Sequence, residues 1–244
     1  MGVRRPVSMS AKVSFLAGVV TLGLSIGHPV GAAGPSPSES LARLKTGNGR
    51  FVAAPEDALP IDAVKRAALA QGQAPFATVL SCADSRVPPE VIFHTGLGDL
   101  FVVRAAGNIT DHAILASVEY AAEHLHVPLV VVMGHESCGA VKATMDTPAG
   151  KSLGPNLDFL IKAIRPSVTA SASAPEATRM RTAILKNVEE TLNDLVGQSV
   201  ILKELGQAGT IGFVGAYYEL ASGRVFFSEP VSLARMVADK GGER

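Results

Sequence analysis

Short apolar runs alternate along this chain with longer segments whose apolar residues recur at helical spacing. Apolar runs of this length, rich in β-branched and aromatic residues, predict buried strands. Five such runs occur, at residues 76–81, 100–104, 129–133, 210–217 and 224–228. The run at 129–133 is the most strongly β-branched, with three consecutive valines.

Between these runs, the spacing of apolar residues predicts helices. They cover residues 38–52, 62–71, 110–126, 139–145 and 157–164, and residues 176–205 hold one long helix and a second one, split near Gly197. Because proline removes a backbone donor and clashes with the preceding turn, we expect Pro166 to end the helix over 157–164. We expect residues 167–175 to form a flexible surface loop.

This order of elements predicts an α/β fold. Strands that alternate with helices form right-handed crossovers, and these give a mostly parallel sheet with helices on both faces. We expect about four parallel strands. A tight turn at Ser222-Gly223 makes the fifth strand an antiparallel edge strand. Ligands of such sheets gather beyond the carboxyl ends of the strands.

The first 33 residues have a different pattern. Arg4, Arg5 and Lys12 precede an uncharged apolar run of 14 residues, and small residues follow Pro29. This pattern is typical of a secretory signal peptide over residues 1–33, and the apolar run is shorter than the ~20 residues of a membrane span. An uncleaved membrane anchor is the alternative. We expect a periplasmic or secreted protein without a membrane association after cleavage, exported by the Sec or the Tat route.

Composition narrows the possible functions. The chain has 244 residues, of which 47% are apolar and 18% charged, with 22 basic and 22 acidic side chains. This excludes a disordered chain and gives no basic excess for binding nucleic acid. Residues 34–244 suit a single domain. The two cysteines are too few for a disulfide-rich scaffold.

Both cysteines follow predicted strands, and each has another possible metal ligand nearby. Cys82 and Asp84 follow the first strand, and His135 and Cys138 follow the third. Thiolate, imidazole and carboxylate are the usual zinc ligands. The spacing of His135 and Cys138, at a turn from strand to helix, allows both to face one ion. The sequence therefore predicts a zinc site at the edge of the sheet.

Simpler interpretations of the same residues stay open at this point. Two cysteines in an exported protein can form a disulfide, or they can be free thiols in the core. His135 can be a buried histidine beneath a loop. Asp84 can be a turn residue or a helix cap.

The segments Cys82-Ala83-Asp84-Ser85-Arg86 and His135-x-x-Cys138-Gly139 together closely resemble the β-class carbonic anhydrases. The resemblance extends from about Leu41 to Phe227. Further segments that match in order and spacing are Pro88-Pro89-Glu90, residues 98–104, Ala106-Gly107-Asn108, residues 117–121 and residues 132–135.

This resemblance implies a zinc enzyme that reversibly hydrates carbon dioxide to bicarbonate and a proton. It implies Cys82, His135 and Cys138 as ligands of one zinc ion per chain. Asp84 is then either a fourth ligand or the partner of Arg86, and these two residues are the expected catalytic pair. The rival hypotheses are a non-catalytic zinc-binding protein and a redox or disulfide protein.

The resemblance also implies a substrate pocket. It assigns Gln73 to bind substrate or bicarbonate, Phe101 and Tyr120 to the aromatic wall of the pocket, and Gly139 to the small position beside the metal. It implies a homodimer or a higher even oligomer, with Gln73 and Tyr120 contributed across the subunit interface.

Overall fold

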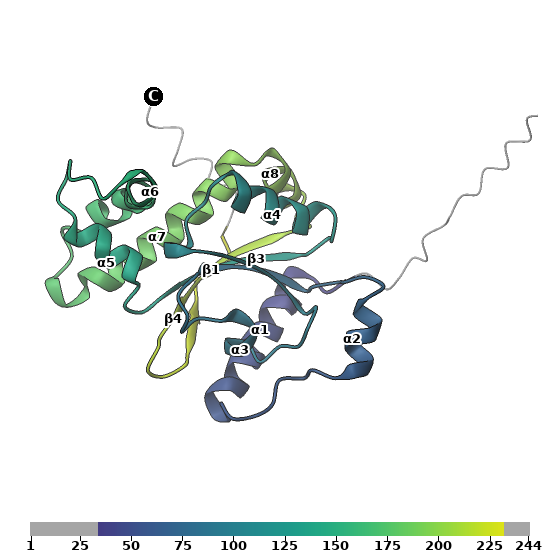
Figure 1. Cartoon of the computed structure of the whole chain (residues 1–244). Helices are drawn as coiled ribbons and strands as arrows, with labels where there is room; N and C mark the ends of the chain where they lie inside the picture. Colours follow the sequence, from purple (N-terminus) through teal and green to yellow (C-terminus); the bar gives the residue numbers. More distant parts are fainter. Residues whose placement is uncertain (1–33, 232–244) are drawn as a thin grey trace, which may run out of the picture. The chain divides into compact units, whose positions relative to one another are not determined.

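The computed structural model describes residues 34–231 of the protein (Figure 1), so the predicted signal peptide lies outside the described residues. A five-stranded sheet runs through the described part in the order β2-β1-β3-β4-β5. Its strands are β1 (Ala77–Cys82), β2 (Leu100–Ala105), β3 (Leu129–His135), β4 (Gly212–Tyr218) and β5 (Val225–Phe227). The first four are parallel to one another, and β5 pairs antiparallel to β4. The predicted fold class is confirmed.

β3 is the central strand of the sheet, and each of its residues is buried. Its side chains alternate between two apolar clusters, as the two-residue period of a strand requires. Val130 and Val132 join one of these clusters, whereas Val131 and Met133 join the other. A strand buried on both faces is continuously apolar, which explains the run at 129–133.

The first helices, α1 (Pro37–Ala53), α2 (Ala63–Leu69) and α3 (Pro89–Ile92), lie on one side of the sheet, where α2 is peripheral and buries no residue (Figure 1). α1 begins slightly before the predicted start, because Ser36 is its N-cap. The Ser36 hydroxyl accepts a hydrogen bond from the Glu39 backbone N–H, and the Glu39 carboxylate accepts one from the Ser36 backbone N–H. Such a capping box satisfies two donors that the first turn otherwise leaves free.

The other face is covered by α4 (His112–Glu123), α7 (Glu176–Gln198) and α8 (Val200–Gln207). The remaining elements are the short 3-10 helix η1 (Ala106–Asn108), α5 (Gly139–Asp146) and α6 (Pro155–Ala170). The predicted split of the 176–205 segment is confirmed, with Ser199 between α7 and α8. Within residues 34–231, no helix is both long and apolar enough to cross a bilayer.

The prediction that Pro166 ends a helix is wrong. α6 continues through Pro166 to Ala170, so the predicted loop over 167–175 is helical in its first part. Ile164 and Ser167, on either side of the proline, are completely buried. Packing of this helix against the rest of the protein therefore outweighs the loss of one backbone hydrogen bond at Pro166.

Candidate metal centre

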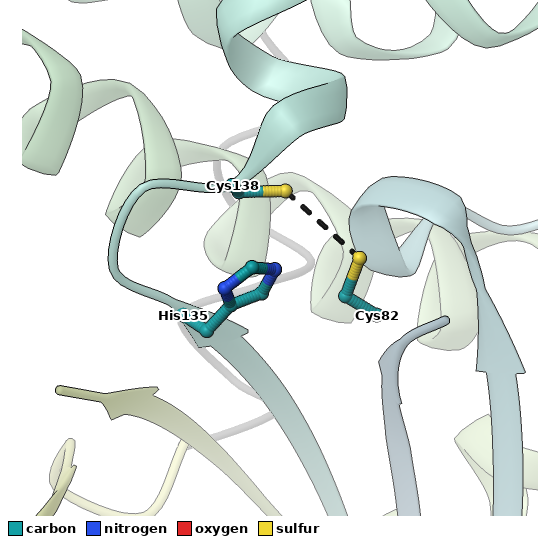
Figure 2. Close-up of side chains that lie close together, drawn as sticks. All are labelled: Cys82, His135 and Cys138. Carbon is teal, nitrogen blue, oxygen red and sulfur yellow. Dashed lines mark hydrogen bonds between the residues drawn. The ribbon is translucent and has the colours of Figure 1, made fainter. Parts of the chain in front are cut away.

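Three buried side chains come together where neighbouring parallel strands end (Figure 2). Cys82 is the last residue of β1, His135 is the last residue of β3, and Cys138 precedes α5. β1 and β3 are adjacent and parallel, so their carboxyl ends lie at the same edge of the sheet. The two sulfur atoms and a ring nitrogen of His135 all lie within 4.8 Å of one another.

The environment of His135 fixes its tautomer. Nδ1 lies 2.9 Å from the backbone carbonyl oxygen of Glu136. A carbonyl oxygen only accepts, so Nδ1 carries the proton and donates it. Nε2 is then unprotonated, is buried, and has no hydrogen-bond partner among residues 34–231. A buried lone pair without a partner, opposite two sulfur atoms, is what a metal ligand requires before binding.

The two thiols interact without forming a disulfide. Both cysteines are free, and their sulfur atoms are 4.0 Å apart. Hydrogen bonding from the Cys138 thiol lowers the pKa of Cys82 to about 4, with smaller contributions from the backbone N–H groups of Asp84 and Gly107. The shared proton, together with burial, raises the pKa of Cys138. Cys82 is therefore the preferred thiolate of the pair.

Beside this cluster, Asp84 is paired with Arg86. Nε and Nη2 of Arg86 donate to the two carboxylate oxygens at 2.9 and 2.7 Å, and the Arg86 backbone N–H donates to Oδ1 as well. Hydrogen bonding to the Arg86 side chain holds the pKa of the Asp84 carboxyl well below its usual value. The same pairing raises the pKa of Arg86. Oδ2 of Asp84 nevertheless lies only 3.9 Å from Nε2 of His135.

The chemistry of these donors fits zinc. Two thiolates and one imidazole are a known catalytic ligand set, which leaves a fourth tetrahedral position open. Two thiolates on one tetrahedral zinc ion lie about 3.8 Å apart, given Zn–S distances of about 2.3 Å. The sulfur atoms of Cys82 and Cys138 are already close to that separation.

The other predicted pocket residues lie away from this cluster. Phe101 pairs with Thr78, four residues before Cys82 in β1, which corresponds to about 13 Å along the strand. Tyr120 is 47% exposed, and its ring lies 6.1 Å from that of Phe101. Gln73 is exposed in the segment before β1. Gly139, by contrast, directly follows Cys138, and a Cβ there would meet open space.

Further contacts at the site were not assigned from the sequence. The Gly107 backbone N–H donates to Sγ of Cys82 at 3.3 Å, and Arg104 donates to the backbone carbonyls of Cys82 and Asp84. Arg104 follows Phe101 on β2, where it pairs with Ser81, so strand register places it beside the site. Knowing the order of strands in the sheet would have revealed this neighbour.

Known proteins resemble this chain over most of its length. The family model described as "Carbonic anhydrase" matches residues 77–225, which include every residue of the cluster. The carbonic anhydrase of Mycolicibacterium smegmatis is 41% identical over 192 residues, which are 78% of this chain and 92% of that protein. The chain belongs to the β-class carbonic anhydrases. Enzymes of this family catalyse the reversible hydration of carbon dioxide to bicarbonate and a proton, and the chain is assigned that activity.

Solved β-carbonic anhydrases have the same fold. One from Aspergillus fumigatus is 27% identical and superposes with a TM-score of 0.61, covering 83% of this chain and 97% of its own. A tetrameric one from Sordaria macrospora is 24% identical with a TM-score of 0.63, covering 80% of this chain and 99% of its own. The five-stranded sheet and its helices are therefore the family's architecture.

Proposed function

We propose that this β-class carbonic anhydrase holds one zinc ion per chain on Cys82, His135 and Cys138. The observation that carries the proposal is the buried Nε2 of His135, which faces two free thiols and has no hydrogen-bond partner within residues 34–231. Its tautomer is fixed by the Glu136 carbonyl, an arrangement typical of histidines that bind metals.

A zinc ion held by Cys82, His135 and Cys138 would act as a Lewis acid and would make a water molecule nucleophilic near neutral pH. Asp84 acts as a hydrogen-bond acceptor for that water, because its carboxylate stays ionised and lies beside the ligand cluster. Arg86 fixes the carboxylate in one orientation with two parallel hydrogen bonds. The carboxylate then orients an oxygen lone pair of the water toward the carbon of the substrate.

The pairing with Arg86 also separates this proposal from a purely structural zinc site. In a structural site Asp84 would be the permanent fourth ligand, and it would need no cation beside it. Here both oxygens of Asp84 accept hydrogen bonds from Arg86. This pairing favours an open fourth position, where substrate chemistry can occur.

The metal content and the hydration rate of the purified protein test this proposal together. We expect one zinc per chain and stopped-flow hydration of carbon dioxide at pH 8.5. Cys138→Ala should lose the metal and the activity, because it removes one of three donors that are buried together. A parent protein with two free thiols, no zinc and no hydration would contradict the proposal.

We further propose that the substrate pocket is completed by a second copy of the chain. Phe101 and Tyr120 are distant from the ligand cluster of their own chain, yet they form an aromatic pair with Tyr120 half exposed. Gln73 is exposed as well. An even oligomer, at minimum a dimer, would bring these three residues to the partner's Cys-His-Cys cluster, where Gly139 leaves room beside the metal.

We propose that residues 1–33 are a signal peptide that directs the protein to the periplasm or outside the cell. Support comes from the basic residues, the 14-residue apolar run and the small residues that end the segment. Mass spectrometry of the exported protein should show a chain that begins near residue 33. An intact Met1 on membrane-bound protein would contradict it.

A further inference from the structure

Two buried polar side chains of α7 contact the short helix η1. Nδ2 of Asn187 donates to the carbonyl oxygen of Gly107 at 2.7 Å, and Oγ1 of Thr191 donates to the carbonyl oxygen of Asn108 at 3.1 Å. Asn187 and Thr191 are each 3% exposed. They are four residues apart, so they lie on the same face of α7, one turn from each other.

The backbone of η1 turns sharply at these two carbonyls. Gly107 has a φ of 67° and Asn108 a φ of 47°, so two successive residues are left-handed. Glycine adopts this conformation freely and asparagine more readily than most other residues, and the contacts from α7 hold the turn in it. A side chain at 107 would also crowd Ile164, because its Cβ would lie 2.6 Å from Cδ1 of that residue.

The same turn positions a hydrogen-bond donor at the ligand cluster. The backbone N–H of Gly107 donates to Sγ of Cys82 at 3.3 Å, in a buried environment. The hydrogen bonds from Asn187 and Thr191 hold the two backbone carbonyls that follow this N–H, those of Gly107 and Asn108. The orientation of the N–H toward the sulfur therefore depends on α7, which begins far along the chain from β1.

We propose that Asn187 and Thr191 are positioning residues for the Cys82 ligand. They act through Gly107, whose N–H stabilises the negative charge on the Cys82 sulfur. Two thiolates place considerable negative charge on a zinc ion, and a hydrogen bond to one sulfur withdraws part of it. This inference rests on the proposed zinc site. It means that contacts from α7 influence the affinity of Cys82 for the metal.

The test measures zinc affinity by competition with a chelator in the purified full chain. Thr191→Val keeps the shape of the side chain and removes its hydroxyl, and Asn187→Leu removes the amide. Each variant should weaken zinc binding about 10- to 100-fold, the usual effect of removing a group that supports a metal ligand. In the cobalt-substituted protein, the sulfur-to-metal absorption band should shift. Thr191→Ser retains the hydroxyl and should restore affinity to within about threefold of the parent.

Thr182→Val is the matched control, because the Thr182 hydroxyl on the same helix donates only within α7, to the Thr178 carbonyl. It should leave zinc affinity and the cobalt spectrum unchanged. If Thr191→Val and Asn187→Leu lower the unfolding midpoint but bind zinc like the parent, the two residues are merely structural and the inference is overturned. A parent that binds no zinc overturns the proposed function, and the inference with it.

Discussion

At the scale of single residues, Arg86 is the side chain whose role is most sharply defined by geometry. Its guanidinium engages both oxygens of Asp84, and it also lies 3.4 Å from the carbonyl oxygen of Ser137, in the turn between His135 and Cys138. Arg86 thus connects the segment after β1 to the segment after β3. Lysine would offer no planar pair of donors to a carboxylate, so the residue type fits a bidentate partner.

Replacing Arg86 by alanine should reduce hydration without removing zinc. Asp84 would lose the two hydrogen bonds that orient it, whereas the three metal donors would remain. We expect a loss of about two orders of magnitude, the size of one positioned acid–base group. Stopped-flow rates and metal analysis of Arg86→Ala check this, with Arg66→Ala on exposed α2 as the control. Hydration at the parent rate would make Arg86 only a counter-ion.

The depressed pKa of Asp84 makes a separate prediction about pH. Because the carboxyl titrates well below its usual value, it is ionised over the whole range from about pH 6 to about pH 9. Activity should rise between about pH 7 and 8.5, where water activated by zinc loses its proton, as it does in the three-histidine carbonic anhydrases. Asp84→Asn should lower the rate by about two orders at every pH and leave this rise in place. If the rise disappears in Asp84→Asn, then Asp84 itself is the titrating group.

At the scale of elements, a glycine is required where two backbone segments lie too close together to leave room for a side chain. Gly47 of α1 faces the backbone of Phe93, and a Cβ on Gly47 would lie 1.9 Å from the Phe93 carbonyl oxygen. The next residue of α1, Asn48, donates to the carbonyls of Ile92 and Gly223 and accepts from the Val225 N–H. α1 is thereby fixed both to the segment around α3 and to the β4–β5 turn.

Gly47→Ala should therefore destabilise the protein, because a carbonyl group of the main chain cannot move aside as the end of a side chain can. We expect a loss of about 1–3 kcal/mol in the free energy of unfolding, measured with urea. Gly49→Ala on the same helix meets no atom within 4 Å. It should be neutral or stabilising by up to about 1 kcal/mol, since alanine favours a helix. Equal stabilities for the two variants would contradict the close packing of α1.

The elements also show what local sequence patterns predict and what they miss. β3 was predictable because a strand buried on both faces is apolar at every position. The course of α6 through Pro166 was not, because the local rule for proline opposes it and distant packing decides. The N-cap at Ser36 was two residues away from the expected helix start, since Ser36 and Ser38 are both suitable caps.

At the scale of the whole molecule, the grouping of Cys82, His135 and Cys138 was predictable and the contacts that support it were not. Cys82, His135 and Cys138 follow recognisable strands, and parallel strands end at one edge of the sheet. Asn187 contacts Gly107 from 80 residues further along the chain. No local pattern marks such a contact. The spacing of residues in an amphipathic helix shows that Asn187 is on the buried face, but it does not show which residue Asn187 contacts. Only the packing of α7 across the sheet reveals it.

We propose that a second chain binds at the β2 edge of the sheet. Among residues 34–231, β2 pairs only with β1, so its other edge presents unpaired backbone groups. Such edges invite another chain. Next to it, the exposed Tyr120 ring lies 6.1 Å from Phe101 and 5.3 Å from His124, a small aromatic group with Tyr120 47% exposed. Aromatic residues of this kind are enriched at the centres of protein interfaces.

Tyr120→Glu should consequently disrupt the oligomer and the activity together. A carboxylate buried against Phe101 in an interface would lack a partner, and this costs more than the lost aromatic contact. We expect sedimentation velocity to show an even oligomer for the parent and monomer for Tyr120→Glu. Hydration should fall at least tenfold while zinc stays bound, because the Cys-His-Cys donors belong to one chain. Leu185→Glu, at a similarly exposed apolar residue on α7, should keep the parent's oligomeric state. A Tyr120→Glu protein that remains oligomeric and fully active would place the interface, and the substrate pocket, on another face.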